Sequence, residues 1–570
     1  MNTNQTTGYP SIDKPWIKYY DSQIINQKLP LCSVYDLVYQ NNKNHMDNIA
    51  LNYFDVKYTY NDLFCNIEKT ERAFYYLGVK ENDIVTICSV TTPETIYSFY
   101  ALNHIGAISN MIDPRVSAEG LKDYINEVNS KVVVCISDAY NKISSIVNKT
   151  SVEKVIVISP SDSLNGIKKF VFDILKAKKI NENNKTLKWN TFINLGDNCK
   201  SVYPNYKKDK CCVIVHTGGT TGTPKGVMLT NDNINSCAVQ AVRAGFDFKR
   251  THNWLCIMPP FIAYGVGNGL HLPLYIGMEV ILIPAFDPNK FDDLLNKYKP
   301  NHMVGVPSHY EKLLYSKKLK NKDLSYIIAP TVGGDALNID LEQKINEYLL
   351  SHNCNYKIVK GYGMSEACAA VCACVSNETN AIGSVGIPFP NMVISVFEPG
   401  TDKELEFGEL GEICISGPNI MSGYYNNSKE TNNVIKLHND GTYWLHSGDI
   451  GTIDYRGFVY IKDRIKRIII KNDGFKVFPS QIEDVLCSAE NIENACVVAK
   501  HINGFSEPIA YVSLKKYDCD FTRQKKTLVN LCKEKLPEYA QPIDFVIKEK
   551  MPLTPIGKID YKFLENEANI

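Results

Sequence analysis

Short runs of apolar, often β-branched residues alternate with longer segments of helical length up to about residue 450. Clear runs lie at 84–90, 131–136, 155–158, 211–215 and 279–284, and each is apolar on both faces. Strands that are buried on both faces are typical of parallel sheets covered by helices. The pattern therefore predicts an α/β fold in which helices cover mainly parallel sheets.

The pattern changes at Val385, where alternating strands and glycine turns begin, as in 393–398 and 411–417. After Asp463 a shorter stretch follows with strand and helix patterns of its own. These changes predict an N-terminal body over 1–463, with a β-rich subdomain at about 385–463, and a separate C-terminal unit over 464–570.

Charge and hydropathy exclude several classes of protein. Among the 570 residues, 62 Lys and Arg balance 62 Asp and Glu, so the chain as a whole has no field that would recruit nucleic acid. No stretch reaches the roughly 18 apolar residues that would span a bilayer. The first residues lack the basic and apolar regions of a secretion signal. A large soluble enzyme of the cytoplasm is the expectation.

The chain has 18 cysteines, and most lie within apolar segments, where cysteine behaves as a small hydrophobic residue. Cys368, Cys372 and Cys374 form the nearest approach to a cluster, and a zinc site there would need a fourth ligand that the neighbouring sequence lacks. Packing is therefore favoured over metal binding, and reduced thiols fit the cytoplasm.

Residues 160–200 are poorly patterned except for a basic amphipathic stretch from Ile167 to Lys179. Such a stretch fits a helix that lies on a membrane surface. It also fits a surface helix whose apolar face rests on the protein core, which is the commoner arrangement and the one expected here.

The strongest local signal is Val213-Ile-Val-His-Thr-Gly-Gly-Thr-Thr-Gly-Thr-Pro-Lys-Gly-Val227. A buried strand leads into small residues whose backbone N–H groups and hydroxyls can face an anion, and Lys225 supplies positive charge. The loop is not a P-loop, because Gly226 stands where that motif has its magnesium-binding hydroxyl. It predicts a phosphate site formed by Thr217, Gly218, Gly219, Thr220, Thr221, Gly222 and Lys225.

This loop resembles the (S/T)-G-T-T-G-x-P-K-G signature of the class I adenylate-forming enzymes, which include acyl- and aryl-CoA synthetases, peptide-synthetase adenylation domains and firefly luciferases. Further segments resemble the other motifs of that superfamily and follow in the same order. They are Gly361-Tyr-Gly-Met-Ser-Glu366, Trp444-Leu-His-Ser-Gly-Asp449, Asp463-Arg-Ile-Lys466 and Pro552-Leu-Thr-Pro-Ile-Gly-Lys558. A coincidence of five ordered motifs between residues 217 and 558 is not plausible.

The resemblance implies both a fold and a reaction. The fold would be an N-terminal body with two α/β sheet subdomains and a β-rich subdomain, followed by a small mobile C-terminal α+β cap. In the reaction, a carboxylate attacks the α-phosphorus of ATP to give an acyl-adenylate and pyrophosphate. A thiol then displaces AMP and forms a thioester. Because the first step joins two anions, the protein must neutralise charge and align the reactants.

The resemblance also assigns roles to residues. The loop from Thr217 to Lys225 would hold the β- and γ-phosphates, Tyr362 and Gly363 together with the Gly333-Gly334-Asp335 turn would line the adenine, and Asp449 and Arg464 would hydrogen-bond the ribose. The implied catalytic residues are Ser365, Glu366, which would bind Mg²⁺, and Lys558, which would bridge the carboxylate and the α-phosphate. Lys466 would be the hinge and Gly474 would line the thiol tunnel, although the turn around Gly474 is one residue longer than the usual pattern.

The acid itself is less well defined. Residues 258–268 contain no carboxylate that could pair with an ammonium group, so α-amino acids are disfavoured. The run Phe-Ile-Ala-Tyr-Gly-Val-Gly-Asn is similar to one in benzoate- and hydroxybenzoate-CoA ligases, although many acyl-CoA synthetases have His at the place of Ile262. The implied acyl pocket is formed by Ile262, Ala263, Tyr264, Gly265 and Ala367, and an aryl or a medium- or long-chain acyl group remains open.

Three functions therefore remain. The first is an acyl- or aryl-CoA synthetase that uses ATP, Mg²⁺ and CoA on a small-molecule carboxylic acid. The second is a stand-alone enzyme that loads the phosphopantetheine of a separate carrier protein. The third is a nucleotide-binding relative without catalytic activity, which the presence of Lys225, Glu366, Asp449 and Lys558 disfavours. The oligomeric state is left open.

Overall fold

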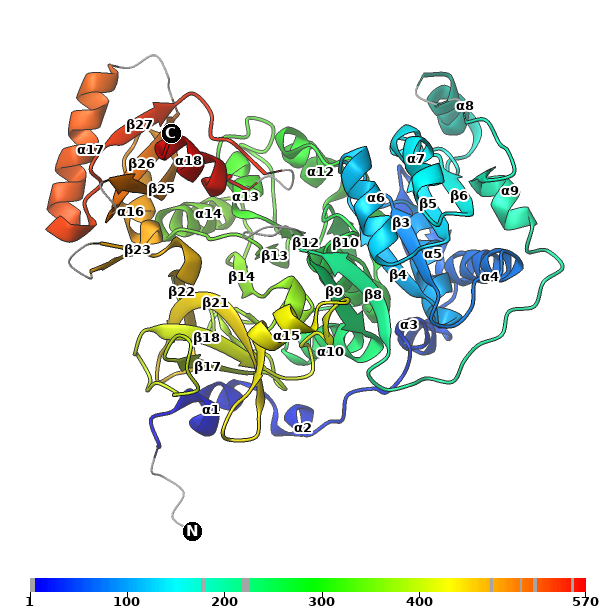
Figure 1. Cartoon of the computed structure of the whole chain (residues 1–570), viewed down its shortest axis with the longest axis horizontal. Helices are drawn as coiled ribbons and strands as arrows, with labels where there is room; N and C mark the ends of the chain where they lie inside the picture. Colours follow the sequence, from blue (N-terminus) through cyan, green and yellow to red (C-terminus); the bar gives the residue numbers. More distant parts are fainter. Residues whose placement is uncertain are drawn as a thin grey trace, which may run out of the picture.

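Two large sheets, one of eight and one of nine strands, form the framework of the molecule (Figure 1). The computed structural model describes residues 6–175, 178, 180–217, 225–471, 475–502, 505–515, 520–554 and 558–570. Within these residues no helix combines the length and the hydropathy that crossing a bilayer requires. The predicted α/β class is confirmed.

The eight-stranded sheet is parallel from β8 to β7, and β9 and β19 extend it in antiparallel orientation. Four of the predicted strands lie here, β3, β5, β6 and β8, and their interior positions are buried. In sheet order the strands are β19 (Gly423–Tyr424), β9 (Gly226–Thr230), β8 (Cys211–His216), β4 (Ile108–Ile112), β3 (Ile84–Cys88), β5 (Val132–Ile136), β6 (Lys154–Ile158) and β7 (Thr186–Lys188).

The nine-stranded sheet is parallel from β1 to β14, with antiparallel strands at both edges. The run predicted at 279–284 forms β11. In order the strands are β16 (Ile387–Pro388), β15 (Cys372–Ala373), β14 (Val359–Tyr362), β13 (Ala329–Val332), β12 (His302–Gly305), β10 (Asn253–Cys256), β11 (Glu279–Leu282), β1 (Ile49–Tyr53) and β2 (Val56–Thr59).

Helices cover both sheets. They are α3 (Val34–Asn42), α4 (Tyr60–Tyr76), α5 (Pro93–His104), α6 (Ala118–Glu127), α7 (Tyr140–Ile146), α8 (Gly166–Leu175), α9 (Trp189–Asn194), α10 (Asn231–Arg243), α11 (Leu272–Ile276), α12 (Phe291–Tyr298), α13 (Pro307–Leu314) and α14 (Ile339–Ser351). A π-helix, η3 (Gly265–His271), leads directly into α11. Such π-helical turns are rare and often occur at functional sites.

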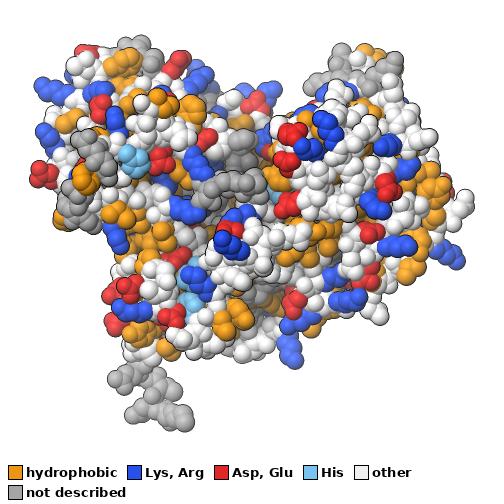
Figure 2. Space-filling view, viewed as in Figure 1, with side chains coloured by type: hydrophobic (Ala, Val, Ile, Leu, Met, Phe, Trp, Pro, Cys, Tyr) orange, Lys and Arg blue, Asp and Glu red, His pale blue; other side chains and the backbone are white. Residues whose placement is uncertain are grey.

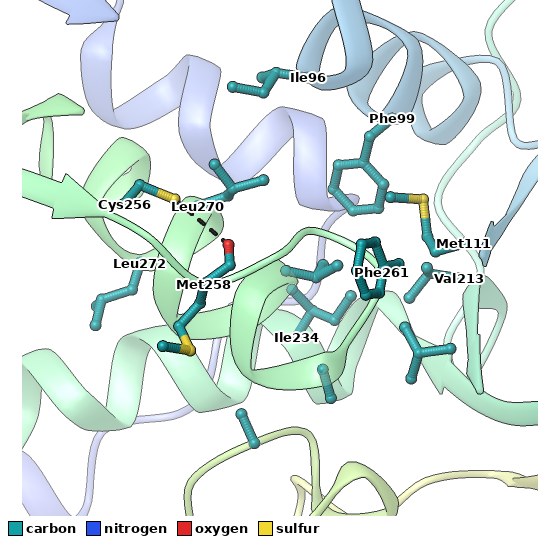
Figure 3. Packing of buried hydrophobic residues seen from close by; sticks show 14 of the residues in the cluster. Ile96, Phe99, Met111, Val213, Ile234, Cys256, Met258, Phe261, Leu270 and Leu272 are labelled. Atoms are coloured by element: carbon teal, nitrogen blue, oxygen red, sulfur yellow. Dashed lines mark hydrogen bonds between the residues drawn. The ribbon is translucent and has the colours of Figure 1, made fainter. Parts of the chain in front are cut away.

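A continuous apolar core joins the two sheets. Figure 3 shows side chains from α5, such as Phe99, from the eight-stranded sheet, such as Val213, and from β10, such as Cys256, in one packed group. The helix α10 contributes Ile234 and the π-helix contributes Leu270. Because the π-helix belongs to this core, the backbone that carries the predicted acyl segment is held firmly.

A five-stranded antiparallel sheet is formed by strands between residues 393 and 464. It consists of β17 (Val393–Phe397), β18 (Gly411–Ser416), β21 (Tyr443–Ile453), β20 (Ile435–Leu437) and β22 (Val459–Arg464), with α15 (Ser428–Val434) beside it. The N-terminal helices α1 (Pro10–Asp13) and α2 (Ser22–Ile25) lie next to this sheet in Figure 1.

The chain after β22 has separate apolar cores of its own. A three-stranded sheet of β25 (Ile492–Ile502), β26 (Phe505–Leu514) and β27 (Phe545–Lys548) is its centre. The other elements are β23 (Ile469–Ile470), β24 (Lys476–Val477), α16 (Pro479–Cys487), α17 (Phe521–Lys535) and α18 (Tyr561–Ala568). We call residues 465–570 the tail.

One expectation for the 160–200 segment is wrong. The amphipathic stretch does form a helix, α8, but its apolar face does not rest on the core. Ile167, Phe170, Val171 and Ile174 are all exposed, and only Phe172 packs against the core. Hydrophobic periodicity locates a face on a helix, but it does not specify which neighbour that face meets.

Candidate functional site

The loop predicted to bind phosphate joins β8 to β9 at one end of the eight-stranded sheet. Its central residues, Gly218, Gly219, Thr220, Thr221 and Gly222, lie outside the described residues. The ends of the loop are held together, because the backbone N–H of Thr217 donates to the carbonyl oxygen of Lys225 at 3.1 Å. Lys225 is thereby fixed at the base of the loop.

The ammonium group of Lys225 has two partners. It forms an ion pair with the carboxylate of Glu430 on α15, and it lies 4.8 Å from the centre of the Tyr424 ring. An ammonium group over an aromatic face is attracted by the negative potential of the ring. The side chain of Lys225 is therefore held in place by one residue of β19 and one residue of α15.

Glu366 lies close to this lysine. It belongs to a short 3₁₀ turn, Ser365–Ala367, just after β14, and its Oε1 accepts a hydrogen bond of 2.7 Å from the hydroxyl of Tyr424. Burial, and after it the charge of Glu366, raise the pKa of Tyr424, so the phenol remains a neutral donor. Tyr424 thus connects the predicted metal ligand Glu366 to the predicted phosphate ligand Lys225.

Sequence reasoning did not find Tyr424 or Glu430. Both follow the loop by about two hundred residues, and they reach it only because β19 pairs with β9, with Tyr424 opposite Val227. The side chain of Asn233, at the start of α10, also donates at 2.8 Å to the carbonyl oxygens of Pro418 and Ile420 and holds the preceding segment. Pairing at such a separation leaves no local signal.

A second cluster is built around Asp449. Its carboxylate is 5% exposed, accepts a hydrogen bond of 2.6 Å from the hydroxyl of Tyr362, and lies 3.1 Å from Nε of Arg464. Asp449 and Arg464 are opposite each other on β21 and β22. Burial raises the pKa of Asp449, while Arg464 and the hydroxyl of Tyr362 act in the opposite direction. The two residues predicted to hold a ribose therefore form an ion pair, and half of the Arg464 side chain remains open to a ligand.

Lys558 of the tail lies at this same cluster. Burial lowers its pKa, and so does Arg464, while Asp335 and Asp449 of the body act in the opposite direction. Its backbone N–H donates to Oγ1 of Thr554 at 3.1 Å, which closes the turn that carries it. The structure thus brings Lys558 to the residues that were predicted to hold the adenosine.

Lys466, the predicted hinge residue, lies near Lys225. Burial lowers the pKa of Lys466, and the positive charge of Lys225 lowers it further. The negative charge of Glu430 acts in the opposite direction. Figure 2 shows Lys and Arg side chains interspersed with acidic ones on the face where the tail meets the body. Several cations within one partly buried region attract a polyanion. Gly474, predicted to line the thiol tunnel, lies outside the described residues.

The Gly333-Gly334-Asp335 turn follows β13 and faces the acyl segment. The backbone N–H of Gly333 donates to Gly305 at 3.0 Å, and a Cβ added at Gly333 would lie 3.5 Å from the hydroxyl of Tyr264. Gly334 has a φ of +79°, a backbone conformation that residues with a side chain rarely adopt. Within the described part of the chain, the buried hydroxyl of Tyr264 has no hydrogen-bond partner. A buried hydroxyl without a partner between these two segments is a natural contact for a ligand.

The predicted acyl residues lie together. Gly265 begins the π-helix, and a Cβ there would overlap the carbonyl of Pro259 at 1.7 Å. Gly267 of the same helix lies next to Cys368 and Ala369, which follow the buried Ala367. The wall on this side is therefore made of small apolar groups and a thiol. Of the other predicted residues, Ala263 is buried and Ile262 is half-buried.

One group of side chains in the described residues has the composition of a metal site. The ligand atoms of Glu412, Cys414 and His446 lie within 4.8 Å of one another. Hydrogen bonds explain this arrangement, because Glu412 Oε2 lies 2.9 Å from His446 Nδ1 and Glu412 Oε1 accepts from the N–H of Gly448 at 3.0 Å. Nε2 of His446 lies 2.9 Å from Nε2 of His438. We therefore assign Glu412 to holding the turn that precedes Asp449.

The predicted packing role of Cys368, Cys372 and Cys374 agrees with the structure. Cys372 and Cys374 are buried, and their thiols lie 3.6 and 3.8 Å from the carbonyl oxygens of Val385 and Ser384. Cys368 is also buried. None of the three belongs to a metal-type group within the described residues.

Replacement of Gly363 by Ala tests the turn that carries Glu366. An added Cβ would lie 1.6 Å from the carbonyl oxygen of Ala369, and such an overlap with backbone cannot be relieved by a side-chain rotation. We expect Gly363→Ala to lower the free energy of unfolding by about 1–3 kcal/mol, measured by urea denaturation. Gly361→Ala is the matched control, since its Cβ would meet the nearest atom at 3.5 Å. Equal losses in the two variants would contradict this account.

Replacement of Glu412 by Ala tests the turn before Asp449. It leaves the N–H of Gly448 and the ring of His446 without their acceptor, and we expect a loss of about 2–4 kcal/mol in unfolding free energy at pH 7. Glu398→Ala, which removes an exposed ion pair with Lys403, should cost well under about 1 kcal/mol.

The loss in Glu412→Ala should also depend on pH. Burial opposes ionisation of Glu412, but the hydrogen bond from His446 prevails and the pKa of Glu412 is lowered. A carboxylate with a lowered pKa stabilises the fold above its unfolded pKa, and this contribution disappears as the pH falls through the folded value. The difference between wild type and variant should therefore be largest above about pH 5 and shrink below about pH 4. A difference that does not change with pH would exclude an ionised carboxylate at Glu412.

Comparison with known proteins identifies the family. The family model described as AMP-binding enzyme matches residues 38–425, more than half of the chain, and the model of the AMP-binding enzyme C-terminal domain matches residues 481–558. The chain is 28% identical over 564 residues to a long-chain-fatty-acid–CoA ligase of Bacillus subtilis, covering 97% of this chain and 98% of the relative. It is 30% identical over 480 residues to a probable 4-coumarate–CoA ligase of Dictyostelium discoideum, covering 83% of each.

A solved structure shares the fold. The benzoate CoA ligase of Burkholderia xenovorans LB400 superposes with a TM-score of 0.79 at 19% identity, covering 94% of this chain and all of that one. The two matches lie in the body and in the tail and include the loop from Thr217 to Lys225, the motif at 361–366 and the motif at 552–558, while the motifs at 444–449 and 463–466 lie between the two matched ranges. The chain therefore belongs to the family of AMP-binding enzymes.

Proposed function

We propose that this protein activates a carboxylic acid with ATP and then transfers the acyl group to the thiol of CoA. It is an acid–thiol ligase of the AMP-forming kind. The observation that carries the proposal is the position of Lys558 of the tail, which lies near enough to Asp335, Asp449 and Arg464 of the body for their charges to shift its pKa. A lysine so placed serves the joining of a carboxylate to a phosphate.

In the first half-reaction, different residues would bind different charged or polar groups of the reactants. Lys225 and the loop that begins at Thr217 would hold the β- and γ-phosphates, and Asp449 would accept from the ribose while Arg464 donates to it. Lys558 would bridge the carboxylate oxygen and the α-phosphate as negative charge builds up between them. Lys225 and Lys558 already lie in partly buried positions where their fields are weakly screened, whereas about half of the Arg464 side chain is exposed.

We further propose that Glu366 binds Mg²⁺, with Ser365 beside it. Mg²⁺ in nucleotide sites usually takes only one or two carboxylates and keeps several waters. Glu366 fits this pattern as a single carboxylate. One of its oxygens accepts a hydrogen bond from the hydroxyl of Tyr424, and the ring of Tyr424 in turn contacts the ammonium group of Lys225. When bound, the ion would withdraw charge from the phosphates.

In the second half-reaction a thiol displaces AMP. We propose CoA as the thiol, in line with the named activities of the long-chain-fatty-acid and 4-coumarate relatives. Lys466 would be the hinge about which the tail turns, and Gly474 would line the path of the thiol. The phosphopantetheine of a separate carrier protein is the alternative acceptor, and the experiment on substrates below distinguishes the two.

The acid is proposed to carry an apolar acyl or aryl group. The segment around Tyr264 and Gly265 faces Cys368 and Ala369, and this wall offers no carboxylate to an ammonium group. The two relatives act on a long-chain fatty acid and on an aromatic acid, and both substrates are apolar. Because the described cysteines carry free thiols, we place the reaction in a reducing compartment such as the cytoplasm.

Replacement of Lys558 by Ala separates the half-reactions. We expect a loss of roughly 100-fold or more in acid-dependent pyrophosphate release, because the charge between carboxylate and α-phosphate is no longer neutralised. Conversion of supplied acyl-AMP and CoA to the thioester should be largely kept. Lys550→Ala, at an exposed lysine of the same tail, is the control and should leave both rates unchanged. Equal losses in the two half-reactions of Lys558→Ala would refute the assignment.

A substrate panel tests acid and acceptor together. Benzoates, cinnamates and fatty acids of increasing length are each supplied with ATP, Mg²⁺ and either CoA or a holo-carrier protein, and pyrophosphate and thioester are measured. We expect apolar acids to react with CoA at rates well above those of α-amino acids. Thioester on the carrier alone would select the second function. Nucleotide binding without turnover of any acid would support the non-catalytic relative.

A further inference from the structure

A surface pocket of about 470 Å³ lies on the body, and none of the residues that line it belongs to the site described above. Its walls come from α3, α10 and α11 and from the chain between α2 and α3, which Figure 1 shows passing along the edge of the molecule. Pockets that hold small ligands commonly measure about 300–1,000 Å³. We call it the α3–α10 pocket, and its main lining residues are Lys28, Leu37, Gln40, Val239, Val242 and Arg243.

The floor of the α3–α10 pocket is apolar. Leu37 and Val239 are buried, and Val242 is half-buried beside them. Such a floor attracts the hydrocarbon part of a ligand, because their contact removes apolar surface from water. The rim is polar. On α3, Oε1 of Gln40 accepts from Nζ of Lys43 at 2.8 Å, which leaves the NH₂ group of Gln40 as a donor.

Arg243 forms one side of the rim. Its Nη1 and Nη2 donate at 2.9 and 3.0 Å to the backbone carbonyl oxygens of Gln27 and Lys28, and these bonds hold the chain between α2 and α3 against α10. A carbonyl oxygen carries no net charge. The hydrogen bonds therefore satisfy two donors of the guanidinium group, but its positive charge is not neutralised.

Three further cations surround the pocket. Lys28 is an exposed residue of the wall, and Lys43 contacts the rim amide of α3. Arg250 donates to the backbone oxygen of Asn41, which also lines the pocket. Together with Arg243 they make four cations. In the described part of the chain none of the four forms an ion pair, so their charges remain available to an anion.

Neighbouring carboxylates do not neutralise these charges. Asp36, on the first turn of α3, accepts from the hydroxyl of Ser33 at 2.6 Å and does not line the pocket. Asp247, which follows α10, lies 2.9 Å from the ammonium group of Lys249. The acidic groups of the adjoining segments thus have partners of their own.

Tyr275, in the wall of the pocket, senses the same charge distribution. Burial raises the pKa of its phenol, Arg243 lowers it, and the thiol of Cys32 acts with burial, while no described carboxylate contributes. The carboxyl ends of α3, α10 and α11 also meet here, and each carries about half a negative charge. They offset about one and a half of the four positive charges, so the pocket remains positive.

The helix α10 separates this pocket from the predicted acyl pocket. Cys237 is turned by about 200° around the helix from Val239, which faces the α3–α10 pocket. The thiol of Cys237 lies 3.6 Å from Oδ1 of Asn268 and 3.8 Å from the carbonyl oxygen of Ala370. The two pockets therefore lie on different sides of one helix.

We propose that the α3–α10 pocket is a second, non-catalytic binding site for a small amphipathic anion. The hydrocarbon or aromatic body of the ligand lies on the apolar floor. Its carboxylate or phosphate group is bound by Lys28, Arg243 and the amide of Gln40. Binding at this site does not depend on the reaction proposed above.

Photolabelling locates the ligand. The full chain is irradiated with a ten-carbon fatty acid that carries a diazirine in its chain, and the labelled residues are mapped by mass spectrometry. We expect labels within 27–41 and 239–243, besides any in the acyl segment. An excess of decanoate or of decyl phosphate should remove these labels, whereas decanol should not, because it has no charge to pair with the cations. The stronger of the two anionic competitors identifies the headgroup.

Variants test the two halves of the pocket. Lys28→Glu should weaken the competition by decanoate about tenfold, because it replaces an attraction at the rim by a repulsion. Val242→Phe fills the floor and should remove the labels at 27–41 while leaving those of the acyl segment. The matched control is Lys317→Glu, at an exposed lysine after α13, which changes the net charge by the same amount and should behave as wild type does.

Labels confined to the acyl segment, equal competition by decanol and decanoate, or equal competition in wild type and Lys28→Glu would overturn the proposal. Acid-dependent pyrophosphate release keeps this test separate from the proposed function. Lys28→Glu should retain the wild-type rate, since Lys28 contributes no group to the site. A chain that is labelled in the α3–α10 pocket but lacks ligase activity would leave the binding site intact and refute only the proposed function.

Discussion

The buried carboxylate of Asp449 is the interaction on which the site depends. It accepts a hydrogen bond from the hydroxyl of Tyr362, at the end of β14, and forms an ion pair with Arg464, at the end of β22. A carboxylate that is 5% exposed would take up a proton if it had no such partners. The same pairing opposes the rise in the pKa of Asp449 that burial causes, and it joins the nine-stranded sheet to the five-stranded one. Removal of one member of such a pair is costly, because the other charge remains buried.

The pairing also fixes where the tail begins. Arg464 is the last residue of β22, and Lys466 follows it within one turn. Lys558 returns to the same place from the far end of the tail. The cations of the site thus come from positions 225, 464, 466 and 558, and the fold brings them together. A chain with equal numbers of positive and negative residues can in this way gather several cations at one site that meets a polyanion.

The sequence predicted much of the framework, and physical reasons explain what it missed. Runs that are apolar on both faces predicted β3, β5, β6, β8 and β11 correctly, because only buried strands need such runs. Motif positions such as Glu366, Asp449 and Lys558 were predicted from resemblance, and their roles stay predictions. Tyr424 and Glu430 were missed, since strand pairing over about two hundred residues creates no pattern near the loop. The orientation of α8 was wrong, because a helical period does not reveal whether a face meets protein or solvent.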